Sequence, residues 1–220
     1  MDSVHRYYED IASKYDQDRF QNSYGRYIDA LERPILSSLL SSSGPKENLE
    51  IACGTGRFLN FAHTGVDVSK NMLKIAREKY PEAHLVNASF DSIPLEEQSF
   101  SNIYAFHLVM HLNDSKVEKL SKEAMRLLKD DGSLIIDVPS HFRRRFKSKR
   151  NDWHGSYAPP LRIFEQLGWT ITKVHPVMFV PIHRIPNRFR GGFLSVEKVL
   201  STLIPTFCAS YMILEMRKTQ

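Results

Sequence analysis

Small residues and a carboxylate follow two short apolar stretches in the first third of the chain. The first stretch runs into the loop Ala52-Cys53-Gly54-Thr55-Gly56. Residues with little or no side chain let a ligand come close to backbone N–H groups. The second stretch, Gly65-Val66-Asp67-Val68, carries a carboxylate where a βαβ unit commonly binds a ribose diol. The loop and the acid together predict a crevice that binds a nucleoside.

The short separation between Gly56 and Asp67 narrows the class of nucleoside ligand. Dehydrogenases that bind nicotinamide dinucleotides place this acid about 20 residues beyond the glycine loop. The spacing therefore disfavours such an enzyme. It also predicts a first crossover helix of about two turns, beginning near Arg57.

Three histidines are candidates for accepting a proton. His107 and His111 are four residues apart, a spacing that puts both on one face of a helix, and His154 follows a basic segment. For the first two, a packing role competes with a catalytic one. The sequence predicts no metal site, because no acidic ligand pattern accompanies the pair.

These groups need a scaffold, and apolar stretches alternating with helical patterns provide one. The predicted strands are 48–52, 65–68, 84–88, 102–106, 133–138, 169–179 and 209–215. The predicted helices are 4–19, 24–40 (broken near Pro34), 57–62, 70–79, 115–128 and 161–167, with Ser69 and Ser115 as N-caps. Such alternation predicts an α/β fold with a doubly wound parallel sheet.

The loop motif resembles that of the class I S-adenosylmethionine-dependent methyltransferases, in particular the small-molecule, methyltransferase type 11-like branch. The family pattern acid-x-Gly-x-Gly-x-Gly reads here from Glu50 to Gly56, with Ala52 in place of the first glycine. The resemblance covers roughly residues 8–138. It implies a Rossmann-like seven-stranded sheet, mainly parallel, with an antiparallel C-terminal edge hairpin. It also implies S-adenosylmethionine as cofactor and methyl transfer by in-line displacement to a small-molecule acceptor.

The resemblance also assigns roles to individual residues. Tyr15 would cover the methionine end of the cofactor, Arg19 would reach its carboxylate, and Asp67 would hold the ribose. Ser89 stands where the family usually has an acid near the adenine, and Ser101 replaces a further family acid. The expected cofactor-binding residues are Tyr15, Arg19, Glu50, Ala52, Cys53, Gly54, Gly56, Asp67, Val68, Met72, Ser89, Phe90 and Phe106.

The length of 220 residues fits a single domain. Within 1–220 we expect a helical lid over 1–45 and a cofactor-binding core over 46–138. Segments 139–160 and 181–205 are expected to be substrate-side insertions that form a cap. A surface excursion with its own small core is the alternative for the second insertion.

The formal charge of +5 is concentrated locally, with six basic residues among the eight of 143–150. The run is interpreted as a solvated loop, as a site for an anionic or lipid-linked substrate, or as a patch for a membrane surface or nucleic acid. Peripheral membrane contact through 142–150 follows from the third interpretation. Nucleic acid is the less favoured partner, although an RNA or protein methyltransferase remains an alternative. The signature of DNA adenine methylation is absent.

A cytoplasmic location is expected, because the polar stretch Met1–Asp10 is not a signal peptide and Cys53 lies in the ligand loop. A second alternative is a catalytically inactive subunit that binds S-adenosylmethionine as a partner or sensor, since Ser89 and Ser101 depart from the family pattern. No coiled-coil repeat is present, and the sequence predicts no particular oligomeric state.

Overall fold

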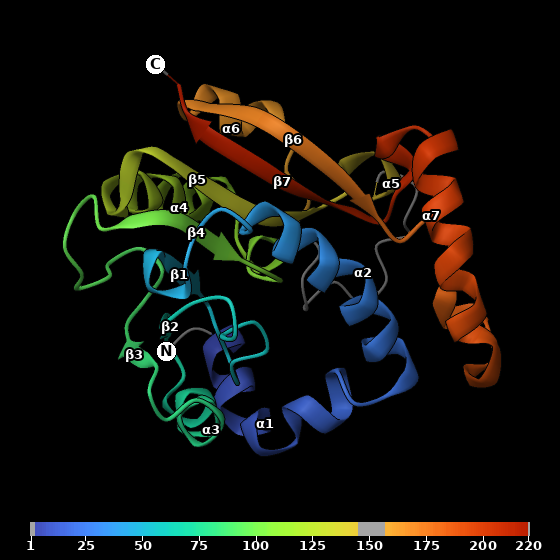
Figure 1. The fold of residues 1–220 in the computed structure, drawn as a ribbon, viewed down its shortest axis with the longest axis horizontal. Coiled ribbons are helices and arrows are strands. Elements are labelled where there is room, and N and C mark those ends of the chain that lie inside the picture. The colour runs from blue at the N-terminus through green and yellow to red at the C-terminus, as the bar shows by residue number, and fades with distance from the viewer. Residues whose placement is uncertain (1–2, 145–156, 220) are drawn as a thin grey trace.

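A seven-stranded sheet with the order β3-β2-β1-β4-β5-β7-β6 forms the centre of the computed structural model, which describes residues 3–144 and 157–219 (Figure 1). The strands are β1 Asn48–Ile51, β2 Thr64–Asp67, β3 His84–Asn87, β4 Phe100–Ala105, β5 Leu128–Pro139, β6 Trp169–Val177 and β7 Tyr211–Lys218. Strand β7 pairs antiparallel with β5 and β6, and the remaining pairs are parallel. The predicted Rossmann-like sheet with its antiparallel C-terminal hairpin is confirmed.

Helices cover both faces of this sheet. The α-helices are α1 Ser3–Arg19, α2 Ser23–Leu39, α3 Lys70–Lys79, α4 Asp114–Leu127, α5 His141–Arg144, α6 Arg162–Gln166 and α7 Phe193–Leu203. Short 3-10 turns are η1 Pro45–Glu47, η2 Val109–His111, η3 Ile182–Arg184, η4 Asn187–Gly192 and η5 Thr206–Cys208. None of the described helices is both long and apolar enough to cross a bilayer.

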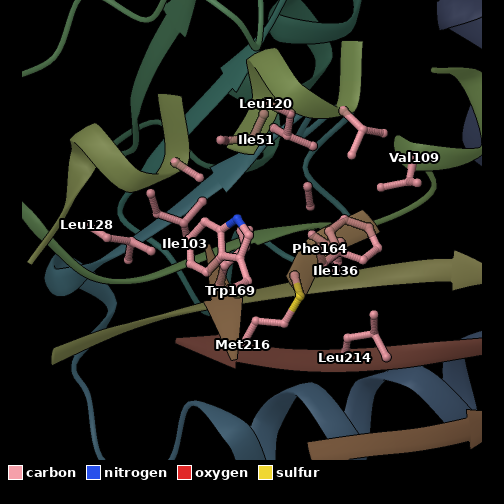
Figure 2. Packing of buried hydrophobic residues seen from close by; sticks show 14 of the residues in the cluster. Ile51, Ile103, Val109, Leu120, Leu128, Ile136, Phe164, Trp169, Leu214 and Met216 are labelled. Atoms are coloured by element: carbon pink, nitrogen blue, oxygen red, sulfur yellow. The ribbon is translucent and has the colours of Figure 1, made fainter. Parts of the chain in front are cut away.

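The strands alternate their side chains between two cores, as the pleat requires. On β4, Ile103 and Ala105 join the core under α4 and α6, whereas Tyr104 joins the core under α2. Figure 2 shows the first core, in which Trp169 lies beside Met216. The two cores fix α2 and α4 on opposite faces and leave the carboxyl ends of the central strands open.

The helix predicted from Arg57 to Ala62 is wrong: residues 52–63 form turns. The connection from β1 to β2 must cross between adjacent parallel strands with few residues, so no room is left for a regular helix. Phe58 and Ala62 are nevertheless buried in the core under α2. The crossover is held by its apolar side chains.

The predicted break at Pro34 is also wrong, since α2 continues through it. Leu36 and Leu39 bury the last turns of this helix, and that burial offsets the missing N–H donor. The cap of α4 also differs from prediction, because Asn113 Oδ1, in place of Ser115, accepts from Lys116 N at 2.9 Å. The Ser69 cap of α3 is confirmed by a 3.1 Å bond from Met72 N.

Candidate active site

The loop after β1 has the backbone conformation of a ligand cradle. Ala52 has φ 58°, Gly54 φ 52° and Gly56 φ 82°, so three residues of the loop are left-handed. A Cβ at Gly54 would meet no atom within 4 Å, which leaves its backbone open on that side. Ala52, which replaces the family's first glycine, therefore occupies a conformation that costs about 1–2 kcal/mol for a residue with a Cβ.

Asp67 joins this loop to the second strand. Its Oδ2 accepts from Gly54 N at 2.8 Å, and its Oδ1 accepts from Ser69 N at 2.8 Å. Burial raises the pKa of Asp67 above its ordinary value, although both N–H donors act in the opposite direction. Each carboxylate oxygen keeps a lone pair that can accept a ligand hydroxyl.

A cavity of about 400 Å³ opens where the loop and Asp67 meet, at the carboxyl ends of the central strands. This is the point where the strand order reverses, the usual ligand crevice of an open α/β sheet. Eleven predicted site residues line it: Tyr15, Ala52, Gly54, Asp67, Val68, Met72, Ser89, Phe90, Phe106, His107 and His111. Val4, His5 and Tyr8 of α1 also line it, beyond the predicted set.

Four predicted cofactor residues do not line this cavity. Arg19 Nη2 donates to Tyr7 Oη at 3.1 Å, and Cys53 is buried in a small core with Leu59. A Cβ at Gly56 would lie 2.9 Å from Leu59 Cδ1 and 3.2 Å from Tyr80 Cδ2, so this glycine packs against the protein interior. Glu50 is buried beneath the loop. Predicted residue His154 lies outside the described residues.

Helix α1 covers the cavity and is tied to the core at two points. Thr55 Oγ1 donates to Asp16 Oδ1 at 2.6 Å, and Asn71 Nδ2 donates to the Glu9 carbonyl at 3.1 Å. Next to these ties in the sequence, Tyr8 and Tyr15 pack edge to face with ring centroids 5.7 Å apart. The aromatic face of α1 thus limits access of water to the cavity.

The polar and apolar groups of the cavity fit a nucleoside cofactor with a polar tail. Asp67 offers two carboxylate oxygens, the Gly54 backbone has open space beside it, and Met72 and Val68 provide apolar contact. Beneath the loop, Glu50 Oε2 is buried without a hydrogen-bond partner among the described residues. Burial raises the pKa of Glu50 well above its ordinary value, which favours the protonated form of this carboxyl.

The two cavity histidines have different surroundings. His111 Nε2 lies 3.0 Å from Tyr8 Oη, and the two rings meet at a centroid distance of 5.6 Å. His107 has φ 58°, and its backbone N donates to Asp137 Oδ1 at 2.6 Å. The His111 ring therefore meets α1, whereas His107 is bonded through its backbone to β5 of the sheet.

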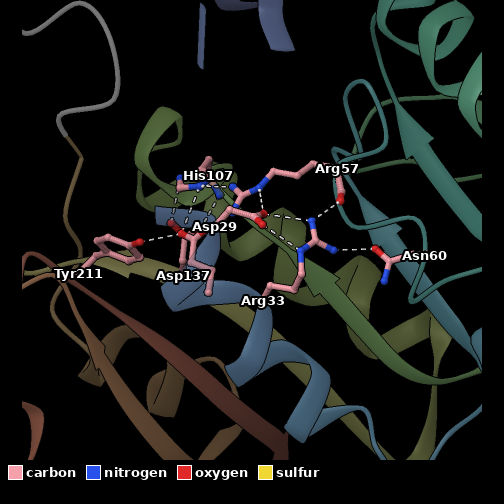
Figure 3. Close-up of polar contacts among 8 residues, drawn as sticks. Asp29, Arg33, Arg57, Asn60, His107, Asp137 and Tyr211 are labelled. Carbon is pink, nitrogen blue, oxygen red and sulfur yellow. Dashed lines mark hydrogen bonds and ion pairs between the residues drawn. The ribbon is translucent and has the colours of Figure 1, made fainter. Parts of the chain in front are cut away.

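His107 belongs to a buried charged network between α2 and the sheet (Figure 3). Its Nε2 lies 3.3 Å from Glu32 Oε1, and its Nδ1 lies 3.4 Å from Asp137 Oδ2. Tyr211 Oη donates to Glu32 Oε1 at 2.7 Å. Both ring nitrogens of His107 thus face carboxylates.

Arg57 supplies the main positive charge of this network. Its guanidinium donates to Glu32 and to Asp29 Oδ1, the latter at 3.0 Å, and its Nη1 lies 3.2 Å from His107 Nε2. The guanidinium also stacks on Phe58, 4.2 Å from the ring centroid. Glu32, His107 and Asp137 place donor atoms within 4.8 Å of one another, as a metal site would, but Arg57 already donates to Glu32 there.

The network shifts the pKa of its members in opposite directions. Burial would raise the pKa of Glu32, but the charges of His107 and Arg57 lower it to about 2. Burial would lower the pKa of His107, but Glu32 and Asp137 more than offset this and raise it above its ordinary value. Burial raises the pKa of Asp137, against the opposing charge of His107. The two carboxylates thus favour the charged form of the His107 ring.

Replacing His107 by asparagine is expected to cost more stability in mild acid than in base. A raised folded pKa gives stability that is fully present below the unfolded value and is lost as pH rises through the folded value. Urea unfolding of the wild type and His107→Asn at about pH 5.5 and about pH 9.5 measures this difference. An equal destabilisation at both pH values would contradict a raised pKa of His107 in the folded protein.

Sequence reasoning missed most of this network: Asp29, Glu32, Arg57, Asp137 and Tyr211. A signal was present for two of them. Glu32 lies four residues from both Ile28 and Leu36 on the apolar face of α2, and Asp137 interrupts the apolar run of β5. A carboxylate on a buried face needs a partner.

Comparison with known proteins agrees with this geometry. The sequence profile of a family described as "Methyltransferase domain" matches residues 49–136. An uncharacterised protein of Methanocaldococcus jannaschii is 30% identical over 174 residues, covering 78% of this chain and 65% of the relative. A putative methyltransferase of Geobacillus is 29% identical over 147 residues, covering 62% of this chain and 59% of that protein. This chain thus spans about three fifths of the length of these relatives.

A further relative and a solved structure extend the comparison. The Campylobacter jejuni ubiquinone/menaquinone biosynthesis C-methyltransferase UbiE is 27% identical over 145 residues, covering 59% of this chain and 60% of that protein. The crystal structure of a Thermotoga maritima protein described as an S-adenosylmethionine-dependent methyltransferase, possible histamine N-methyltransferase, has a TM-score of 0.70. It is 18% identical, and the match covers 96% of this chain and 98% of that one.

Proposed function

This chain belongs to the class I S-adenosylmethionine-dependent methyltransferases, and we propose that it methylates a small molecule bound beside Tyr8 and His111. The observation that carries the proposal is the cavity of about 400 Å³ that Asp67 and His111 both line. One end carries the groups for a ribose, and the other carries a histidine in contact with a tyrosine hydroxyl. A nucleoside and an acceptor can therefore meet in one enclosed space.

Each part of the cavity has a proposed task. Asp67 binds the ribose hydroxyls, Val68 and Met72 contact the adenine, and Ser89 and Phe90 border its far edge. Tyr15 on α1 excludes water from the methyl group. S-adenosylmethionine supplies an already activated methyl group, so the protein's main work is positioning.

We propose His111 as the group that accepts the acceptor's proton. Its Nε2 lies 3.0 Å from Tyr8 Oη, a position that an acceptor hydroxyl or amine can share. Burial raises the pKa of Tyr8, so this hydroxyl stays neutral and can donate or accept a hydrogen bond. His107 is assigned a positioning role, because both of its ring nitrogens face carboxylates.

A small acceptor is favoured over RNA or protein because α1 covers the cavity and is tied to the core through Asp16 and Glu9. The name of the relative UbiE places quinone precursors among the acceptors to be tried. Within one domain, α1 is the proposed lid. The cavity-lining residues do not include any from 181–205, so we do not assign that segment to the acceptor site.

Replacing Asp67 by asparagine is expected to weaken S-adenosylmethionine binding about 30-fold, because a hydrogen bond to a charged acceptor contributes about 2 kcal/mol. Calorimetric titration with S-adenosylmethionine and S-adenosylhomocysteine measures this. Asp91→Asn is the matched control, since Asp91 also lines the cavity but already bonds Ser89. Unchanged binding by Asp67→Asn would contradict the ribose assignment.

Methyl transfer is tested by incubating the protein with methyl-labelled S-adenosylmethionine and a panel of phenols, quinols, hydroxy compounds and amines. Label recovered in one acceptor class supports the proposed function. Tight cofactor binding without transfer to any class, in the presence of cell extract as a further acceptor source, would support the inactive sensor instead.

A further inference from the structure

Exposed apolar side chains gather at one edge of the molecule. Among the residues that the structure describes, every exposed large apolar side chain except Val68 belongs to α5 or to 189–207. They are Phe142, Phe189, Val196, Val199, Leu203 and Phe207. Figure 1 places α5 and α7 at the same end of the sheet, away from α1. We call this edge the α7 face.

Helix α7 presents a fixed apolar stripe to solvent. Val196, Val199 and Leu203 are 39%, 55% and 75% exposed, and their spacing of three and four residues puts them on one side. The inward side is held by Glu197, which accepts from Phe179 N at 2.8 Å, Val180 N at 2.9 Å and Tyr27 Oη at 3.1 Å. Because these bonds lock the helix about its axis, the stripe cannot turn inward.

A shallow apolar groove of about 610 Å³ continues the stripe toward η4. It is lined by Ile185, Phe189, Phe193 and Val196, with Arg184 at its border. Arg188 lies over the Phe189 ring, 4.7 Å from the centroid. Cations therefore stand directly beside the exposed aromatic and aliphatic groups.

The α7 face carries no surface acid between residues 181 and 208. The only acidic residue there is Glu197, which is buried, whereas Arg184, Arg188, Arg190 and Lys198 are basic. Arg190 is tied to Ser23 Oγ at 2.9 Å, and the others remain at the surface. An apolar stripe with a purely cationic border matches an anionic lipid surface.

We propose that the α7 face docks this protein onto an anionic lipid bilayer. The stripe would lie in the interface, with the arginines near lipid phosphates. Helix α7 has 11 residues, a length of about 16 Å, which is too short to cross a hydrocarbon core of about 30 Å. A second copy of this chain is disfavoured as the occupant, because a two-fold interface would bring the same cations together.

Vesicle flotation tests the proposal with the full chain. One set of vesicles contains phosphatidylcholine and phosphatidylglycerol in equal parts, and the other contains phosphatidylcholine alone. Wild-type protein is expected to float with the anionic vesicles, less with the neutral ones, and less in high salt because exposed charges are screened.

A matched pair of variants isolates the apolar stripe. The stripe variant is Val199→Glu/Leu203→Glu, and its partner is Ser201→Glu/Thr202→Glu. Both add the same charge to exposed positions of α7. The Ser201 and Thr202 hydroxyls donate to backbone carbonyls of α7. The stripe variant is expected to bind anionic vesicles at least about tenfold more weakly than its partner. Thermal unfolding confirms that both variants fold.

Three results would overturn the proposal. Wild-type protein that fails to float with anionic vesicles is one, and equal binding by the two folded variants is another. The third is a dimer in sedimentation that only Val199→Glu/Leu203→Glu dissociates, which would assign the α7 face to a second copy.

Discussion

Replacing Arg57 by methionine is expected to lower the free energy of unfolding by about 3–5 kcal/mol, the cost of removing one partner of a buried ion pair. Glu32 is fully buried and receives its charged hydrogen bond from Arg57, whose side chain is only 10% exposed. Methionine keeps the contact with Phe58 but removes the charge. Urea unfolding of the two proteins near neutral pH measures the loss.

Arg33 provides the matched control for that measurement. It also bonds Asp29 and lies over Phe58, but its side chain is 36% exposed. Arg33→Met is expected to cost about 1 kcal/mol or less, because water screens an exposed ion pair. The double variant Arg57→Met/Glu32→Met should recover part of the stability. Equal losses for Arg57→Met and Arg33→Met would show that the buried network does not depend on Arg57.

Replacing His111 by glutamine is expected to lower kcat about 100- to 1,000-fold with the acceptor that the labelled-methyl panel identifies. Glutamine can still meet the Tyr8 hydroxyl, which lies 3.0 Å from His111 Nε2, but it cannot hold a transferred proton. Binding of S-adenosylmethionine should change little, because the Asp67 end of the cavity is untouched. Initial rates and calorimetric titration on one preparation separate these effects.

His5→Gln is the control for this variant, since His5 on α1 lines the same cavity as His111. It is expected to retain most of the activity, because the proposed proton acceptor is unchanged. If His111→Gln keeps the wild-type kcat, the acceptor loses its proton without this residue, and the proposed role is rejected.

The sheet and the loop-and-acid arrangement at one end of the cavity were predictable from local sequence. Strand periodicity is local, so the order of the seven strands along the chain was predictable, as was the Ser69 cap, whereas helices α5 and α7 were not predicted. The loop at Gly54 and the acid Asp67 are also local signals, because left-handed backbone favours glycine and strand ends carry ligand groups.

The two wrong helix predictions have the same cause, because local sequence signals do not contain tertiary distances or packing. Turns replace the helix expected after Arg57, because the connection has to join the adjacent strands β1 and β2. The distance between these strands cannot be read from residue periodicity. Helix α2 passes Pro34 because Leu36 and Leu39 pack on the sheet, a gain that only the assembled core provides.

Tertiary structure alone decided the distinction between the two histidines. His107 and His111 lie four residues apart in the sequence, yet one faces Glu32 and Asp137 while the other meets Tyr8 of α1. The partners come from α2, β5 and α1, each of which is far from the two histidines in the chain. Burial then makes those long-range pairings strong, because a charge removed from water must find its partner inside the protein.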